Sequence, residues 1–445
     1  MRSASNWQPM YFLVKPSEFG SGTLRVPGDK SISHRALMFG AIANGTTTIT
    51  GFLPGDDCLA TLHALRAMGV QIEHDGATEV TVHGVGLHGL NPPAGPLDLG
   101  NSGTAMRLFC GLLAGQNFDS ELTGDSSLSA RPMARVIDPL QQMGAQIASN
   151  DGRPPLRISG GQRLQGIEYA LPVASAQVKS ALLLAGLYGD GITTVQEPAV
   201  TRDHSERMFM TMGANIASGM GVISISPGSR LKGVAIDVPA DLSSATFPLL
   251  AALLARDSRL VLTQVGINPT RDGVLKILRA MGAQIRVSNK TMRGAEPVAD
   301  LEVTSSKLHG INVDPALVPL AIDEFPALFI AAACAEGTTE FRGLAELRVK
   351  ESDRISAMAQ GLSALGIQVE ELPDGARITG GTFKAGTVDS HGDHRIAMAF
   401  AAAATIAEGP VRIDDVASVA TSFPRFERTF RNLGVNIVKE RGAEQ

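Results

Sequence analysis

The sequence predicts an α/β protein built from six similar units, with three units in each of two domains. Its length of 445 residues is too great for one compact domain, so we expect several hydrophobic cores. A five-residue motif recurs along the chain: a hydrophobic residue, glycine, a small or β-branched residue, glutamine or asparagine, then isoleucine or valine. Its copies lie at 68–72, 143–147, 212–216, 281–285, 365–369 and 433–437, so the repeat spans roughly 70 residues.

Each copy of this motif is predicted to end one helix and begin one strand. Apolar residues upstream of the first copy follow helical spacing, as at Leu59, Leu62 and Leu65. The glycine of the motif suits the left-handed stop of such a helix. The residues after the glycine are typical of a strand.

A second helix in every unit is apolar on almost all sides, which is typical of a helix buried in a core. Examples lie at 181–186, 249–255 and 396–404. Stretches rich in β-forming residues follow these helices at 46–50, 191–195, 259–265 and 411–414. Each unit is therefore predicted as a strand, a buried helix, short strands, a surface helix and a final strand.

The six units divide into two groups of three. The fourth unit begins near 233–240, and a second crossing near 24–28 is needed if the N-terminal strand joins the C-terminal half. We therefore predict one domain of residues 1–26 with 238–445 and another of residues 27–237. A single long solenoid is the alternative, and it is disfavoured because solenoid repeats usually span about 20 to 45 residues.

Composition and charge exclude several classes of function. Hydrophobic residues make up 44% and charged residues 19%, which is ordinary for a globular protein. The net charge of −5 provides no general attraction for nucleic acid or an anionic membrane, so we expect neither partner. The longest apolar run, 396–407, is shorter than the roughly 18 to 25 residues of a membrane helix, and 10–14 is too short for a signal peptide. We expect a cytoplasmic protein.

Cysteine and histidine spacing predicts no metal site. Cys58, Cys110 and Cys334 are far apart and odd in number, so we expect core packing rather than disulfides or zinc ligands. His391 and His394 form an H-x-x-H pair without a recognisable third ligand. We therefore expect no bound metal.

Polar residues gather at the predicted starts of the six buried helices. A purely structural repeat is expected to carry plain capping residues there, but these starts differ from one another. They lie at 29–35, 101–107, 175–179, 241–244, 323–324 and 393–395. Helix N-termini expose unpaired N–H groups and a partial positive charge, so several of them together suit an anion. All six starts are interpreted as variants of one capping position, and we expect them to serve a ligand as well.

Seven cations lie near the predicted helix starts: Lys30, Arg35, Arg131, Arg202, Lys350, Arg354 and Arg395. This number suits two phosphate-bearing ligands, because a phosphate monoester carries a charge of about −1.5 to −2 at pH 7. It is too large for one neutral ligand. For each residue taken alone, a solvated ion pair or a helix cap is an equally ordinary explanation, although this alternative is weaker for Lys30.

These motifs together resemble the 5-enolpyruvylshikimate-3-phosphate synthase family of enolpyruvyl transferases over nearly the whole chain. They are VPGDKSISHR at 26–35, GNSGTAMR at 100–107, RPM at 131–133, RVKESDR at 348–354 and DHR at 393–395. SAQVKS at 175–180 is similar to the second class of that family, because the first class usually has a Ser-Ser-Gln version. The related UDP-N-acetylglucosamine enolpyruvyl transferases share the fold but lack the GDKS and RVKESDR pair.

The resemblance implies a specific fold and reaction. The fold is two inverse α/β barrels, each of three βαβαββ repeats, with a central cleft between them. The reaction transfers the enolpyruvyl group of phosphoenolpyruvate to the 5-hydroxyl of shikimate 3-phosphate and releases phosphate, in the aromatic amino-acid pathway. It implies these two small molecules as partners, no cofactor, and a monomer.

The resemblance also implies roles for individual residues. Contacts to shikimate 3-phosphate are expected from Lys30, Ser31, Arg35, Ser175, Ala176, Gln177, Arg202, Asp323 and Lys350. Contacts to phosphoenolpyruvate are expected from Lys30, Gly103, Arg131, Gln177, Arg354 and Arg395. The expected catalytic residues are Asp323 as the base for the 5-hydroxyl, and Glu351 or Lys30 as the acid for the methylene carbon.

Two other functions stay open from the sequence: the UDP-N-acetylglucosamine reaction, and a non-catalytic repeat scaffold. A scaffold explains the repeats but not six different polar helix starts. The resemblance also bears on inhibition by the herbicide glyphosate. Second-class members that tolerate glyphosate often carry alanine at the position of Gly103. Since glycine is retained here, we expect inhibition by glyphosate.

Overall fold

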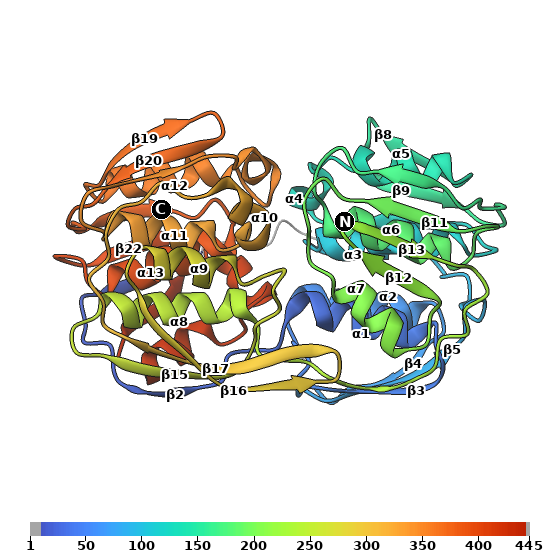
Figure 1. Cartoon of the computed structure of the whole chain (residues 1–445), viewed down its shortest axis with the longest axis horizontal. Helices are drawn as coiled ribbons and strands as arrows, with labels where there is room; N and C mark the ends of the chain where they lie inside the picture. The colour runs from blue at the N-terminus through green and yellow to red at the C-terminus, as the bar shows by residue number, and fades with distance from the viewer. Residues whose placement is uncertain (1–9, 442–445) are drawn as a thin grey trace. The chain divides into compact units, whose positions relative to one another are not determined.

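The computed structural model describes residues 10–441, and these residues form two compact units (Figure 1). Unit 1 comprises the described parts of Met1–Val26, Ala240–Lys290 and Val298–Gln445, and unit 2 comprises Pro27–Pro239 and Thr291–Pro297. The short segment 291–297 was expected in the other half. Each unit has its own hydrophobic core.

Unit 2 consists of three repeats of one arrangement. Its buried helices are α1 (Lys30–Ala41), α3 (Gly103–Ala114) and α6 (Ala176–Gly186), and its outer helices are α2 (Asp56–Ala67), α4 (Ser126–Ser129), α5 (Ala134–Gln142) and α7 (His204–Thr211). Its sheets have the strand orders β14-β3-β5-β4, β6-β7-β9-β8 and β10-β11-β13-β12.

The strands of unit 2 in chain order are β3 (Asn44–Thr50), β4 (Gln71–Glu73), β5 (Val80–Val85), β6 (Leu97–Asp98), β7 (Ser120–Thr123), β8 (Gln146–Asn150), β9 (Arg153–Ser159), β10 (Glu168–Ala170), β11 (Thr193–Gln196), β12 (Ile216–Gly219), β13 (Val222–Ile225) and β14 (Ala235–Asp237). In each sheet the first two strands are parallel and the other neighbours are antiparallel.

Unit 1 repeats the same arrangement. Its buried helices are α8 (Leu242–Leu254), α11 (Phe325–Ala333) and α13 (His394–Ala404), and its other helices are α9 (Gly273–Ala280), α10 (Val318–Ala321), α12 (Arg354–Ala364) and α14 (Phe426–Asn432), with short 3-10 turns η1 (Pro315–Leu317), η2 (Ala345–Val349) and η3 (Ala417–Thr421). Its sheets have the orders β16-β17-β15-β2, β18-β20-β19 and β21-β22-β1-β23.

The strands associated with unit 1 are β1 (Met10–Lys15), β2 (Gly22–Leu24), β15 (Arg259–Gly266), β16 (Gln284–Arg293), β17 (Glu296–Thr304), β18 (Thr338–Phe341), β19 (Gln368–Leu372), β20 (Gly375–Thr379), β21 (Gly386–Asp389), β22 (Val411–Asp414) and β23 (Asn436–Arg441). The hairpin of β16 and β17 begins in unit 1, and its tip, 291–297, belongs to unit 2.

The strands that border the two chain crossings complete sheets formed by distant parts of the sequence. Strand β1 lies between β22 and β23, so the N-terminal strand closes the last repeat of unit 1. Strand β2 pairs with β15, and β14 pairs with β3. Each crossing strand therefore stays in its own unit while the chain passes on to the other unit.

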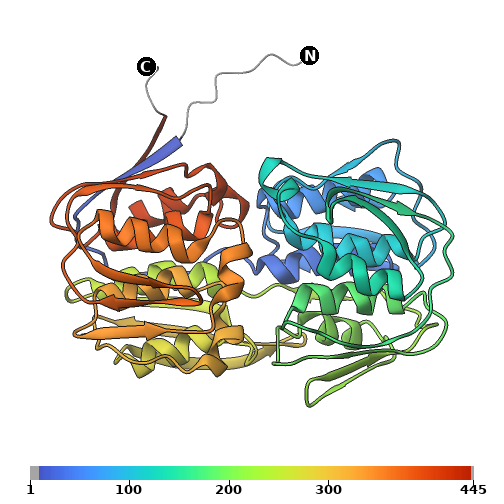
Figure 2. The same ribbon diagram turned by 90° about the horizontal axis from the view of Figure 1, so that it is seen from above.

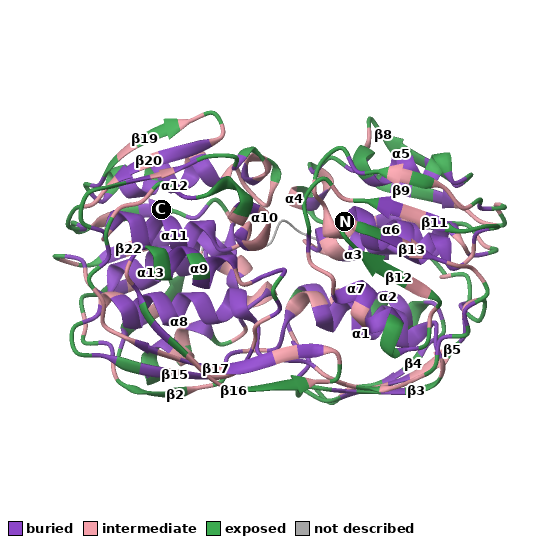
Figure 3. Cartoon of the chain, viewed as in Figure 1, coloured by how far each residue is buried: buried purple, intermediate pink, exposed green. Residues whose placement is uncertain are grey.

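The buried helices lie inside each unit and the sheets lie on its outside (Figure 2). The inner helices are almost entirely buried, as their apolar composition predicts (Figure 3). Helices α3 and α6 contact through their backbones at Gly111, where an added Cβ would lie 2.0 Å from the carbonyl oxygen of Ala181. None of the described helices is long and apolar enough to cross a membrane.

The recurring glycine ends a helix in all six repeats, as the sequence predicts. Gly69, Gly144, Gly213, Gly282, Gly366 and Gly434 have φ between 84° and 100°, in the left-handed region that glycine adopts without strain. A strand follows each of them: β4, β8, β12, β16, β19 and β23. The six repeats and their α/β class are therefore confirmed.

Gly213→Ala is expected to lower the free energy of unfolding by roughly 1 to 2 kcal/mol, the usual cost of a left-handed alanine. No heavy atom lies within 4 Å of the added Cβ, so the loss reports the backbone conformation alone. Gly219→Ala is the matched control, because its Cβ also meets open space but its φ is not positive. Urea denaturation measures both variants, and equal losses would contradict the explanation.

Candidate active site

The starts of the buried helices carry their own caps in five cases out of six. The side chains of Asp29, Ser102, Ser175, Asp241 and Asp393 each accept a backbone N–H from the first turn. These five residues therefore cap their helices, and their expected ligand contacts stay predictions. The physical reason for the caps is that the first N–H groups of a buried helix have no intrahelical acceptor and need a partner.

The caps differ in charge, and this difference divides the capped helix starts into a negatively charged group and a neutral group. Asp29, Asp241 and Asp393 place a negative charge on their helix N-termini. Ser102 and Ser175 cap α3 and α6 with a neutral hydroxyl. Because the N-terminus of a helix carries a partial positive charge, the starts of α3 and α6 retain their attraction for an anion.

The start of α6 is linked to Arg35 by a group of hydroxyl side chains. Arg35 donates from Nε to Ser205 at 2.7 Å and from Nη2 to Ser180 at 2.8 Å. Ser180 in turn donates to the backbone carbonyl of Ala176 at 2.7 Å. Arg35 also donates to the carbonyl of Ser31 at 3.0 Å. The first turns of α1, α6 and α7 therefore converge on one guanidinium.

Arg35 is a buried cation held by neutral groups. Burial lowers its pKa to about 10, an effect that the charge of Glu206 opposes and that of Arg202 increases. The guanidinium therefore stays charged at neutral pH. A buried charge whose hydrogen-bond acceptors are hydroxyls and a carbonyl is favourable for binding an anion.

Lys179, next to this group, has a structural role. It is almost fully buried in α6 and forms ion pairs with Glu197 at 3.1 Å and Glu206 at 2.6 Å. Because Glu206 lies in α7, the pair ties α6 to α7.

The start of α3 lies among three side chains that sequence reasoning only partly identified. A Cβ on Gly103 would lie 2.8 Å from Nη1 of Arg107 and 3.0 Å from Nη1 of Arg131. Arg107 donates to the Oε1 atom of Gln177 at 2.8 Å, and Gln177 donates to the hydroxyl of Thr104 at 2.9 Å. Gly103, Arg131 and Gln177 are therefore brought together, with Arg107 as the residue between them.

Lys30 is paired with a carboxylate. Its ammonium contacts Asp57, in the first turn of α2, and both side chains are largely buried. The ion-pair explanation that the sequence left open therefore holds for Lys30 in this structure. Lys30 can serve an anion only by sharing or leaving Asp57.

Arg354 is the centre of the acidic cluster in unit 1. Its side chain is 1% exposed and donates to Asp393 at 2.7 Å and to Glu351 at 2.5 Å, with Asp323 at 3.4 Å. Burial alone would lower its pKa, but the charges of Asp393, Glu351 and Asp323 raise the pKa above its usual range. Arg354 therefore stays charged and holds three carboxylates in place.

Asp323 and Arg395 complete this cluster. Arg395 lies 3.6 Å from the Oδ2 atom of Asp323 and donates to its backbone carbonyl at 3.2 Å. The cluster then contains three carboxylates and two guanidiniums, with a net charge of −1. Lys350 pairs with Glu346 at 3.3 Å instead of with a carboxylate of this cluster.

A second buried network holds the residue beside Asp323. Arg271 donates to Asp241 at 3.0 Å and to Ser243 at 2.6 Å, and Ser243 donates to Glu324. Glu324 is the residue between Asp323 and helix α11. The starts of α8 and α11 are therefore fixed to each other.

Cysteine chemistry does not enter the site. Burial raises the pKa of the Cys110 and Cys334 thiols to about 12, so both stay protonated at neutral pH. Cys58 is also buried, and its thiol lies 3.8 Å from the carbonyl oxygen of Lys30.

Sequence reasoning missed the residues that position the expected ones. Asp57, Arg107, Ser180, Ser205 and Asp393 were not assigned a role. Arg107 had a usable signal, because it lies one helical turn after Gly103 on the same helix. The contact of Asp57 with Lys30 and that of Asp393 with Arg354 had no local signal, because they span 27 and 39 residues of sequence.

Comparison with known proteins gives a consistent result. A family model described as EPSP synthase (3-phosphoshikimate 1-carboxyvinyltransferase) matches residues 14–430. A 3-phosphoshikimate 1-carboxyvinyltransferase of Alkalilimnicola ehrlichii is 60% identical over 97% of both chains, and one of Methylococcus capsulatus is 57% identical over 96% of this chain and 98% of its own. An EPSP synthase structure from Acinetobacter baumannii superimposes with a TM-score of 0.87 at 51% identity, covering 98% of this chain and 100% of that one.

His34, in α1, links this helix to α2 and to the cap of α3. Its Nδ1 lies 2.8 Å from the hydroxyl of Thr61 in α2, and its Nε2 lies 3.4 Å from the hydroxyl of Ser102. Burial, followed by the charges of Lys30 and Arg35, lowers its pKa well below the usual value. The ring is therefore neutral in the folded protein at neutral pH.

We expect His34 to make the fold sensitive to mild acid. Below about pH 6.5 the unfolded chain binds a proton at this residue and the folded chain does not, so stability falls by up to about 1.4 kcal/mol per pH unit. His34→Gln keeps a neutral hydrogen-bonding group and should lack this component. Denaturation between pH 7.5 and 5 measures the difference, and parallel curves for the two proteins would contradict the assignment.

Proposed function

The chain belongs to the EPSP synthase family, and we propose that the helix starts of its unit 2 bind the substrate anions while the carboxylates of its unit 1 act as acid and base. The enzyme transfers the enolpyruvyl group of phosphoenolpyruvate to the 5-hydroxyl of shikimate 3-phosphate and releases phosphate. Its fold is the pair of inverse α/β barrels of this family. The observation that supports the proposed division is the neutral cap on α3 and α6.

Shikimate 3-phosphate is proposed to bind at α6. Ser175 and Ala176 offer the phosphate a helix N-terminus without a negative cap, and the Ser175 hydroxyl still has its hydrogen to donate. Arg35 and Arg202 add positive charge beside it. The other proposed contacts are Lys30, Ser31, Gln177, Asp323 and Lys350.

Phosphoenolpyruvate is proposed to bind at α3. Gly103 allows close approach to the helix start, and Arg131 lies next to it. Gln177 is oriented by Arg107 and Thr104, which suits its proposed contact with both substrates. Lys30, Arg354 and Arg395 are the other proposed contacts.

The proposed chemistry is addition followed by elimination. Asp323 accepts the proton of the 5-hydroxyl as its oxygen bonds to C2 of phosphoenolpyruvate, and a proton is added at C3. The adduct then loses phosphate and a C3 proton, which restores the double bond. Lys30 carries its proton in the ion pair with Asp57, whereas Glu351 accepts a hydrogen bond from Arg354 and has to take up a proton first.

We also propose that the enzyme works as a cytoplasmic monomer without a metal or cofactor. Both steps transfer protons and exchange carbon–oxygen bonds, so neither needs a redox group. The net charge of −5 argues against nucleic acid as a partner. Dependence of phosphate release on shikimate 3-phosphate, rather than on UDP-N-acetylglucosamine, tests the substrate assignment.

Lys30→Met is expected to remove most turnover and leave the fold intact, because the variant loses the cation and the proton donor proposed at both substrates. Because the Asp57 side chain is 6% exposed and loses its Lys30 partner, Lys30→Met is paired with Asp57→Asn, which removes the buried carboxylate charge and should keep thermal unfolding close to wild type. Steady-state phosphate release measures turnover. A folded variant with unchanged turnover would contradict the role of Lys30.

Gly103→Ala is expected to weaken glyphosate inhibition more than phosphoenolpyruvate binding. The methyl displaces the tips of Arg107 and Arg131, which are flexible, and glyphosate is the longer molecule. A single methylene discriminates by roughly 1 to 3 kcal/mol, or about 5- to 150-fold in the inhibition constant relative to KM. Gly95→Ala is the control, because its Cβ meets open space. Equal changes in the inhibition constant and KM would contradict the prediction.

A further inference from the structure

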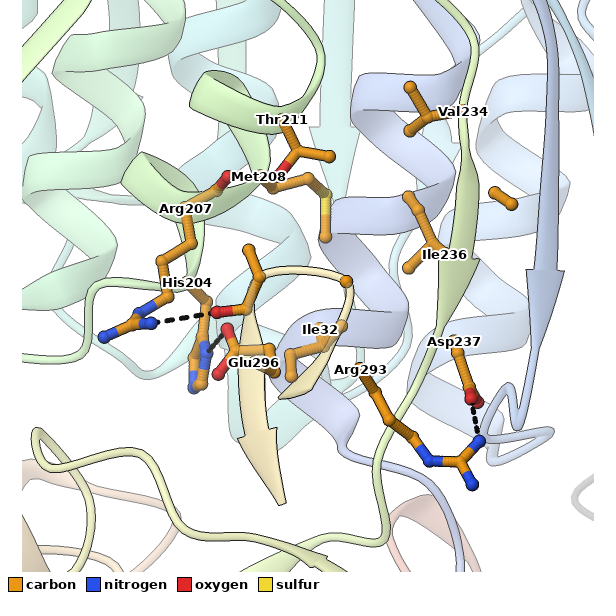
Figure 4. Close-up of a pocket in the computed structure, with 13 residues that line it drawn as sticks. Ile32, His204, Arg207, Met208, Thr211, Val234, Ile236, Asp237, Arg293 and Glu296 are labelled. Carbon is orange, nitrogen blue, oxygen red and sulfur yellow. Dashed lines mark hydrogen bonds and ion pairs between the residues drawn. The ribbon is translucent and has the colours of Figure 1, made fainter. Parts of the chain in front are cut away.

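The tip of the β16–β17 hairpin, 291–297, is held in unit 2 by three polar contacts (Figure 4). Glu296 pairs with Nδ1 of His204 at 2.7 Å. The backbone carbonyl of Ala295 accepts from Arg207 at 2.9 Å. Arg293 pairs with Asp237, in β14.

A pocket lies beside the tip, and the tip residues Gly294, Ala295 and Glu296 line part of it. The pocket has an empty volume of about 400 Å³, counted with the solvent at its mouth, and its lining includes Ile32, Met208 and Ile236. The polar contacts with His204, Arg207 and Asp237 link the tip to α7 and β14 (Figure 4).

The three contacts differ in burial. The side chains of His204 and Glu296 are 2% and 10% exposed, whereas those of Arg293 and Asp237 are 33% and 31% exposed. Exposed ion pairs contribute little because water screens them, while breaking a buried hydrogen-bonded pair is costly. The His204–Glu296 pair is therefore the contact with the strongest effect on position.

His204 is the first residue of α7, and that helix start carries part of the shikimate 3-phosphate site. The next residue, Ser205, accepts from Arg35 at 2.7 Å and bonds to Ser180 at 2.7 Å. Arg202 lies two residues before His204, and its charge acts on Arg35. A shift of the His204 backbone therefore moves Ser205 and Arg202 together.

We propose that Glu296 is a positioning residue for shikimate 3-phosphate, which it acts on through His204 and the first turn of α7. An ionised carboxylate only accepts hydrogen bonds, so Glu296 fixes the Nδ1–H form of the ring and its orientation. The inference rests on the proposed placement of the shikimate 3-phosphate site at Arg35 and Arg202. No substrate atom has to touch Glu296 or His204.

Glu296→Ala tests this role in the full-length enzyme by steady-state kinetics. The KM for shikimate 3-phosphate should rise by about 2- to 30-fold, the usual range for a residue that acts on a site through its neighbours. The kcat, and the KM for phosphoenolpyruvate at saturating shikimate 3-phosphate, should stay near wild type. Glu296→Gln should restore most of the loss, because its amide oxygen still accepts from Nδ1.

Arg293→Ala is the matched control. It removes an ion pair from the same hairpin tip, but its partner lies on β14 and not on α7. We expect no change in the KM for shikimate 3-phosphate. An equal rise in Arg293→Ala and Glu296→Ala would overturn the proposal, because it would mean that any loosening of the tip has the same effect.

A double variant keeps the test decisive if Glu296→Ala is unstable. Glu296→Leu keeps the bulk of the side chain but accepts no hydrogen bond, so it should raise the KM for shikimate 3-phosphate alone and add nothing to His204→Phe, since both act through one contact. Additive effects would overturn the pairing. Arg202→Gln tests the underlying site: if it raises that KM and Glu296→Ala does not, the positioning role is wrong and the site stands, whereas if neither changes it, the proposed site is wrong as well.

Discussion

A buried helix has to satisfy the N–H groups of its first turn, and the way this chain meets that requirement decides where its charges lie. Five of the six inner helices use a serine or aspartate side chain as the cap. In the sixth, α11, Pro326 lies in the first turn and has no N–H to satisfy. Serine and aspartate stabilise a helix N-terminus about equally well. The choice between them therefore has little effect on stability and can serve function.

The caps follow the proposed division of the chemistry, apart from Asp29 on α1 of unit 2. An aspartate cap attracts a cation: Asp393 holds Arg354, and Asp241 holds Arg271. These pairs fix Asp323, Glu351 and Glu324 in a cluster that suits proton transfer more than phosphate binding. The serine caps of α3 and α6 keep the positive end of the helix, with Arg131 and Arg35 near these starts. In the proposed function, unit 1 thus supplies acid and base groups, and unit 2 supplies anion sites.

The repeats were predictable from the sequence because their signals are local. A glycine stop such as Gly213 and the strand that follows it occupy a few adjacent residues, and so do the caps at Ser102 and Ser175. The sequence indicates a capping position at all six polar starts, but the same residue types suit caps and ligands. Contacts such as Lys30–Asp57 and His204–Glu296 join distant segments, and only the folded chain brings them together. The contacts that place the hairpin tip, 291–297, in unit 2 also join segments that are distant in the sequence.

Ser175→Asp tests the central claim most directly, because it changes the charge of a cap without removing the cap. Aspartate accepts the same backbone N–H, so the unfolding temperature should stay at or above that of wild type. The affinity for shikimate 3-phosphate, measured by calorimetric titration, should fall by a hundredfold or more, roughly, since like charges about 4 Å apart repel by about 4 kcal/mol near a protein surface. Unchanged affinity in a stable variant would contradict the claim that a neutral cap makes α6 an anion site.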